Sequence, residues 1–164
     1  MDPTQIIITR LLKEVSPGQT IALGRGIPQL IKPHLETSIK ILDLTPTTEI
    51  QPVHLAVVEA EEVSQRGDFS LTSGQEVPSL EADLWVVTAP HRRADGTPRI
   101  VQTCQLPISP TGTATTIITD LAVIRIQEMG LVLIEVAPGI GADEVKTHTT
   151  ARIHVADDIK VMEL

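Results

Sequence analysis

The chain consists of short runs of β-branched and aliphatic residues that end at glycine, proline or polar loops, and this pattern limits its fold more than any other feature. In the first half, apolar runs at 20–23, 39–44 and 54–63 alternate with segments of helical spacing at 3–15 and 30–35. In the second half, such runs follow one another with little helix between them. Interleaved strands and helices, followed by consecutive strands, predict an α/β protein with an open mixed β-sheet and flanking helices.

The second half supplies most of the predicted strands. They are expected at 69–71, 84–88, 98–106, 121–126, 131–136 and 152–155, with a short helix over 142–147. The segment 111–116 is expected to be a polar connection, and the run at 39–44 a buried strand. Since one hydrophobic core is usual for a chain of 164 residues, we expect a single domain over 1–164.

Composition excludes several classes of partner. A formal net charge of -8, without any run of lysine and arginine, opposes binding to nucleic acid. The chain starts without a basic and apolar leader, and no apolar run approaches the roughly 20 residues of a membrane helix. We therefore expect a soluble cytoplasmic protein with no nucleic-acid and no membrane partner. Phe69 and Trp85 are the only aromatic residues, so aliphatic side chains must fill the core.

Neither metal nor thiol chemistry is expected. Cys104 lies in a strand-like run with no adjacent base, which is typical of a small apolar filler. The histidines show no close metal-ligand spacing with cysteine or carboxylates; they are His34, His54, His91, His148 and His154. His91 precedes Arg92 and Arg93 in a loop that could meet an anion, although we favour a solvated turn.

Four segments, in this order, resemble the β subunit of family I coenzyme A transferases, the group that includes 3-oxoacid CoA-transferases. Residues 23–28 read Leu-Gly-Arg-Gly-Ile-Pro, similar to the family's Leu-Gly-x-Gly-Ile-Pro turn, and 55–68 resemble the family's strand that closes on Val-Ser-x-x-Gly-Asp. The others are 95–107 and, most specifically, 118–139. The resemblance implies the CoA-transferase fold, which is of the NagB/RpiA-like type, in a shortened and divergent form.

The chain departs from this family at the residue that performs the chemistry. In the family, a glutamate in a Ser-Glu-Asn-Gly turn after the second strand attacks the acyl-CoA thioester, and an anhydride and then an enzyme-CoA thioester follow. Here residues 45–48 read Thr-Pro-Thr-Thr, and Pro46 stands about where the glutamate is expected. Proline has no nucleophilic side chain, so no catalytic residue is assigned.

A second glycine-rich turn of the family, Gly-x-Gly-Gly, helps to shape its acyl site with backbone N–H groups. Residues 77–81 read Val-Pro-Ser-Leu-Glu at this place. Without glycine, the backbone approaches a ligand less closely, and Pro78 removes one donor. Both departures therefore affect the same site.

The retained glycine turn is the candidate ligand-binding site. Gly24, Arg25 and Gly26 lie between a predicted strand and a helix, where free N–H groups favour a phosphate or carboxylate. The alternative, which we favour, is that Arg25 is a solvated loop residue and the glycines serve only the turn.

Other carboxylates are candidates for a relocated nucleophile. Glu49 is the acid nearest to the missing glutamate, but it lacks the Asn-Gly turn, and a surface position is favoured. Glu59 and Glu61 share one face of a predicted strand, with Glu62 beside them, so a carboxylate pair with shifted pKa values is conceivable. An acidic edge that faces solvent or another subunit is the favoured alternative.

Two main hypotheses for the function follow. The first is a pseudoenzyme that resembles the CoA-transferase β subunit, is non-catalytic or strongly impaired, and associates with an α-like subunit or forms a homo-oligomer. The second is an active acyl-CoA transferase or hydrolase in which Glu49, or one of Glu59, Glu61 and Glu62, has become the carboxylate. Both allow a coenzyme A thioester as ligand, and neither needs a separate cofactor. A small-molecule binding module is a third possibility, based only on the glycine turn.

Overall fold

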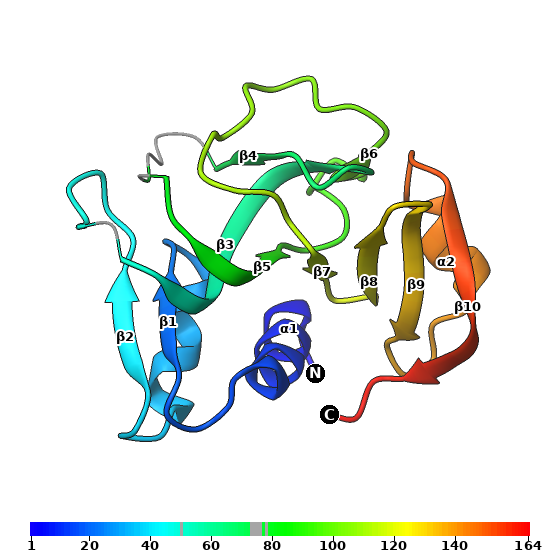
Figure 1. Ribbon diagram of the computed structural model, residues 1–164. Helices are drawn as coiled ribbons and strands as arrows, with labels where there is room; N and C mark the ends of the chain where they lie inside the picture. The colour runs from blue at the N-terminus through cyan, green and yellow to red at the C-terminus, as the bar shows by residue number, and fades with distance from the viewer. Residues whose placement is uncertain (50, 73–76, 78) are drawn as a thin grey trace.

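The computed structural model describes residues 1–49, 51–72, 77 and 79–164 (Figure 1). Its strands form a sheet in the order β10-β9-β8-β7-β5-β3-β1-β2, and β4 and β6 pair with the far end of β3. The strands are β1 (Thr20–Leu23), β2 (Lys40–Asp43), β3 (Val53–Ser64), β4 (Phe69–Leu71), β5 (Ala82–Thr88), β6 (Ile100–Val101), β7 (Thr116–Ile118), β8 (Ala122–Gln127), β9 (Gly130–Val136) and β10 (Ile153–Val161). The helices are α1 (Pro3–Leu11), α2 (Ala142–Thr147) and the 3-10 helices η1 (Leu12–Glu14) and η2 (Ile27–His34).

Strand directions confirm the predicted open mixed sheet. β2, β1, β3, β5 and β7 are parallel neighbours, whereas β7, β8 and β9 pair antiparallel and β10 returns parallel to β9. The strands predicted over 121–126 and 131–136 correspond to β8 and β9, which form an antiparallel hairpin.

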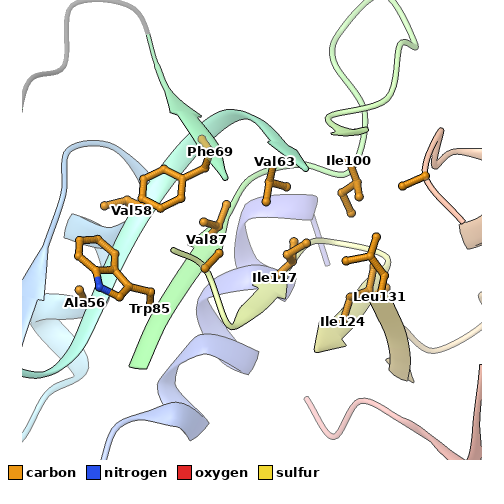
Figure 2. Packing of buried hydrophobic residues seen from close by; sticks show 14 of the residues in the cluster. Ala56, Val58, Val63, Phe69, Trp85, Val87, Ile100, Ile117, Ile124 and Leu131 are labelled. Carbon is orange, nitrogen blue, oxygen red and sulfur yellow. The ribbon is translucent and has the colours of Figure 1, made fainter. Parts of the chain in front are cut away.

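Each face of the sheet carries its own apolar cluster, because successive residues of a strand point to opposite sides. Leu55 and Val57 of β3 face α1 and pack with Ile7 and Leu11. The neighbouring β3 residues face the other way, toward the cluster drawn in Figure 2. There the rings of Phe69 and Trp85 lie 5.8 Å apart, centroid to centroid, among aliphatic side chains.

Local chemistry explains where the first helix begins and why the second predicted helix is a 3-10 helix. Oδ1 of Asp2 accepts a hydrogen bond from the backbone N–H of Gln5, so Asp2 caps α1. The helical spacing predicted over 30–35 corresponds to η2, which begins earlier, at Ile27, and is a 3-10 helix. Pro28 and Pro33 lie within η2 and lack the N–H that regular α-helical bonding requires.

Several of the strand predictions were wrong in extent or burial. The run at 39–44 was predicted as a buried strand, but β2 lies at the edge of the sheet and Ile41 is 38% exposed; of this run, only Leu44, after the strand, is buried. The strand predicted over 98–106 is only β6, because the N–H groups of Gln105 and Leu106 donate to a carboxylate instead of a neighbouring strand. The end of the predicted polar connection belongs to β7, and the last strand continues to Val161.

The strand order creates a switch point between β1 and β3. From β1 the chain moves to β2 on one side, and from β2 it crosses to β3 on the other side. In open α/β sheets, ligands bind at the carboxyl ends of the strands where the order reverses in this way. The turn after β1 and the part of β3 beyond Val57 meet at this edge.

Candidate functional site

The glycine turn after β1 lies against β3. The N–H of Gly24 donates to the carbonyl oxygen of Val57 over 2.8 Å, and a Cβ at position 24 would already lie 3.4 Å from that oxygen. Gly26 has φ +86°, a conformation that residues with side chains rarely adopt. The side chain of Arg25, between them, is exposed. The turn therefore presents backbone, with little side chain, at the switch point.

Glu59 of β3 lies directly over this turn. A Cβ built on Gly26 would overlap Oε2 of Glu59, so the carboxylate occupies the space that the glycine leaves open. Burial raises the pKa of Glu59, and the nearby backbone N–H of Ile27 and the charge of Arg99 offset this only in part.

Glu61 is held in a salt-bridge network. Its Oε1 lies 3.0 Å from Nε of Arg93, and its Oε2 lies 3.2 Å from Nη1 of Arg99. Burial opposes ionisation of Glu61, but the hydrogen bond from Arg93 and the charge of Arg99 outweigh it and lower the pKa. Glu59 and Glu61 thus have opposite pKa shifts, and Glu61 is engaged by two guanidinium groups.

Glu62 has a structural role. Its Oε1 accepts hydrogen bonds from the backbone N–H groups of Gln105 and Leu106 over 2.8 and 2.9 Å, and the residue is 5% exposed. It therefore fixes the segment that follows β6. Of the cluster proposed from the sequence, only Glu59 points to the glycine turn.

Arg99 links the network to Glu59. Its Nη1 pairs with Glu61, whereas its buried Nε has no hydrogen-bond partner among the described residues. A buried guanidinium N–H without an acceptor is costly. Arg99 is therefore a cation near the switch point with unused hydrogen-bonding capacity.

The turn after β2 is held by threonine hydrogen bonds. Thr45 and Thr48 close it, since the N–H of Thr45 donates to Oγ1 of Thr48 over 2.7 Å and that hydroxyl donates to the carbonyl oxygen of Asp43 over 2.9 Å. Pro46 and Glu49 are both exposed. The acid nearest to the missing glutamate is thus a surface residue.

Pro78 lies outside the described residues, so the second turn is described only in part. Leu80 is buried, and its N–H donates to the carbonyl oxygen of Thr111 over 3.4 Å. The carbonyl oxygen of Glu81 accepts from the N–H of Val53 over 3.0 Å. These bonds attach the end of the segment to the sheet.

His91 differs from both sequence interpretations, the solvated turn and the anion-binding loop. Its ring is fully buried between Thr119 and Thr149, whose hydroxyl oxygens lie 2.8 and 2.9 Å from the ring nitrogens. Burial, with the charges of His148 and Arg92, lowers the pKa of His91 to about 4. The imidazole is therefore neutral at pH 7 and joins three segments of the chain.

Cys104 is partly buried, and burial raises the pKa of its thiol. It lies in a loop, not in a strand, and Sγ is 3.6 Å from the carbonyl oxygen of Asp68. Within the described part of the chain, no group of histidine, cysteine and acidic residues could hold a metal ion. None of the helices in that part combines the length and apolar character needed to cross a membrane.

Comparison with known proteins identifies related sequences. No protein-family model matches the chain. The beta subunit of a probable coenzyme A transferase of Bacillus subtilis is 30% identical over 113 residues, which cover 63% of this chain and 52% of that protein. The beta subunit of the acetate CoA-transferase of Haemophilus influenzae is 30% identical over 122 residues, 68% of this chain and 55% of that protein. The chain thus spans about half the length of these relatives.

A third relative matches along its whole length. The beta subunit of the acetate CoA-transferase of Escherichia coli is 23% identical over 209 aligned residues, which cover 97% of this chain and 97% of that protein.

Solved structures share the fold. The acyl-CoA transferase YdiF of Escherichia coli O157:H7 superposes with a TM-score of 0.78 at 16% identity, over 99% of this chain and 43% of that one. The glutaconate coenzyme A-transferase of Acidaminococcus fermentans gives 0.71 at 11% identity, over 99% and 89%. A variant of the decarboxylase AibA/AibB gives 0.75 at 15% identity, over 99% and 90%. These likenesses confirm the predicted fold class.

Proposed function

Since the chain is a divergent relative of the β subunits of coenzyme A transferases, we propose that it is a β-subunit-like protein in which acyl transfer is lost or strongly impaired. The observation that carries this proposal is the turn after β2. Thr45 and Thr48 close this turn by hydrogen bonds, and Pro46 is at the position where the family resemblance implies a nucleophilic glutamate. Without a carboxylate there, no anhydride can form at that position.

Glu49 does not replace the missing group. Its side chain is exposed beyond the threonine turn, and a nucleophile must be held close to its productive geometry. Displacement of a reacting group by about 1 Å costs on the order of a hundredfold in rate. A solvated carboxylate on a loop meets neither requirement.

The proposed action is association with another subunit. The partner is an α-like CoA-transferase subunit or a second copy of the chain, and an acyl-CoA thioester is the proposed ligand; no separate cofactor is proposed. Ile41 of β2 and Leu84 of β5 support association, since both are large apolar residues with 38% and 41% of their surface exposed.

Sedimentation of the purified chain, alone and with a CoA-transferase α subunit, tests the association. We expect a homodimer or a stable complex at micromolar concentration. A monomer that binds neither the α subunit in a pull-down nor coenzyme A by calorimetry would contradict the proposal.

An active enzyme is the second candidate, and the position of Glu59 is the observation that favours it. This carboxylate lies at the switch point beside a backbone N–H, and its raised pKa is typical of functional carboxyl groups. Attack by Glu59 on the thioester carbon would release the CoA thiolate and leave a mixed anhydride. Glu61 and Glu62 are already engaged by arginines and backbone N–H groups.

The two candidates differ in one measurable property. If Glu59 is the nucleophile, turnover of acetyl-CoA or succinyl-CoA disappears in Glu59→Gln and persists in Glu49→Gln. If the first proposal holds, the wild-type chain shows no turnover above that of the Glu59→Gln variant, with or without an α subunit.

A further inference from the structure

The turn after β1 has the backbone features of a site for an oxygen acceptor. Gly26 leaves space for another group at the carboxyl ends of β1 and β3, and Ile27, the first residue of the helix η2, follows it directly. Free N–H groups at such positions attract carboxylate, phosphate or carbonyl oxygens. A helix terminus alone does not identify a ligand, so a second observation is required.

The second observation is the group that lies there. The Glu59 carboxylate fills the space over Gly26, and the nearby N–H of Ile27 favours its ionised form. The positive charge of Arg99 also favours the ionised carboxylate, and the buried Nε of Arg99 has no partner among the described residues. The chain's own Glu59 carboxylate thus occupies the space over Gly26, close to the Ile27 N–H and within the influence of the Arg99 charge.

We propose that Glu59 is a built-in occupant of a small carboxyl-binding site formed by Gly26, Ile27 and Arg99, and that it closes this site to free ligands. The site takes a carboxyl group because a planar group with two oxygens already fits against Gly26. A doubly charged phosphate is disfavoured, because the charge of Glu61 acts at the same position. The inference holds whether or not the chain associates with a partner.

The pH should influence which form of a carboxyl group the site accepts. Burial and Glu61 oppose a negative charge here, while Ile27 and Arg99 favour it, and the opposing effects prevail for Glu59. A free carboxylic acid should therefore enter the opened site more readily at pH 5 than at pH 7.

Rescue of Glu59→Ala by acetate tests the proposal. Removal of the carboxylate leaves the Ile27 N–H and Arg99 in place and opens the space over Gly26. We expect sodium acetate, but not sodium chloride at equal concentration, to raise the folded-to-unfolded ratio of this variant. The gain should saturate and reach roughly tenfold when acetate is about ten times its dissociation constant. It should be larger at pH 5 than at pH 7.

The controls are the wild-type chain and Glu49→Ala, whose altered residue is exposed. Neither should respond to acetate beyond its response to chloride. Equal effects of acetate on all three proteins, or no effect on Glu59→Ala, would overturn the proposal. An effect of phosphate but not of acetate would also contradict it, because the site would then take a tetrahedral anion.

A second measurement applies even if Glu59→Ala does not fold. In amide nitrogen-proton NMR spectra, Glu59→Gln should shift the Ile27 resonance upfield in the proton dimension, since a neutral amide oxygen is a weaker acceptor than a carboxylate. Glu49→Gln should leave Ile27 unchanged. An Ile27 resonance that is the same in wild type and Glu59→Gln would show that the carboxylate does not occupy the site.

Discussion

The Glu59 carboxylate occupies the position at which a side chain on Gly26 would have to begin. Strand β3 therefore packs closely against the turn after β1. Position 26 requires glycine for two reasons, its positive φ and the Glu59 carboxylate beside it.

Gly26→Ala should destabilise the protein strongly. The variant combines an unfavourable backbone conformation, worth about 1–3 kcal/mol, with a collision against Glu59. Gly96→Ala is the matched control, since Gly96 has φ +88° but open space around its Cα. Urea unfolding should give a larger loss for Gly26→Ala, and addition of Glu59→Ala should recover the difference. Equal losses at the two glycines would contradict the collision.

Glu59→Gln should change the pH dependence of stability. Burial raises the folded-state pKa of Glu59, so its contribution to stability is present below the unfolded pKa and is lost as pH rises through the folded pKa. The glutamine variant cannot ionise. Its stability relative to wild type should therefore increase between pH 4 and pH 7 in urea unfolding. A constant difference would mean that Glu59 has the same pKa in both states.

His91 should dominate the loss of stability in mild acid. Its pKa is lowered by burial to about 4 from 6.5, so the unfolded chain takes up the proton first and stability falls as pH drops below about 6.5. The expected loss is about 2 kcal/mol between pH 7 and pH 5. In His91→Gln, whose side chain does not titrate, this part of the pH profile should be flat. A variant profile that still falls by the wild-type amount would refute the assignment.

Arg10 and Glu135 connect α1 to β9 by a bidentate ion pair, with distances of 2.8 and 2.7 Å. Arg10→Met should cost about 3 kcal/mol, because it leaves a largely buried carboxylate without its partner. Lys13→Met is the control, since Lys13 pairs with an exposed Glu163 over 3.6 Å and should change stability by less than about 1 kcal/mol.

The Arg10–Glu135 pair should also contribute to the loss of stability at low pH. The hydrogen bond from Arg10 lowers the pKa of Glu135, so its contribution is present above the unfolded pKa and is lost as pH falls through the folded pKa. Glu135→Gln should have a flatter stability profile below about pH 4.5. A profile that still falls as steeply as that of wild type would exclude this carboxylate as its source.

The fold was predictable because its strands carry their own local signals. β3, β8 and β9 appear in the sequence as apolar runs bounded by turns, and α1 lies within the segment of helical spacing at 3–15. The failure at 98–106 has a tertiary cause. The Glu62 carboxylate, more than forty positions away in the sequence, takes the N–H groups of Gln105 and Leu106 that a strand would need.

The candidate site was predictable only as two separate parts. The sequence identified the glycine turn and the acidic cluster, but it contained no sign that Glu59 lies over Gly26. The alternation of β3 places Glu59 and Glu61 on one face, yet Arg93 and Arg99 arrive from a distant loop and both form salt bridges with Glu61, whereas neither forms one with Glu59 among the described residues. A glycine at position 26, where the structure has a positive φ, was the one local signal of a close approach.

The most direct test of impaired acyl transfer is chemical trapping. The chain is incubated with acetyl-CoA or succinyl-CoA, alone and with an α subunit, treated with hydroxylamine or borohydride, and analysed by mass spectrometry of its peptides. An active CoA-transferase treated in the same way serves as the positive control. We predict unmodified peptides throughout, including those that contain Glu49 and Glu59. A glutamyl adduct at any position would contradict the account, and an adduct at Glu59 would establish the relocated nucleophile.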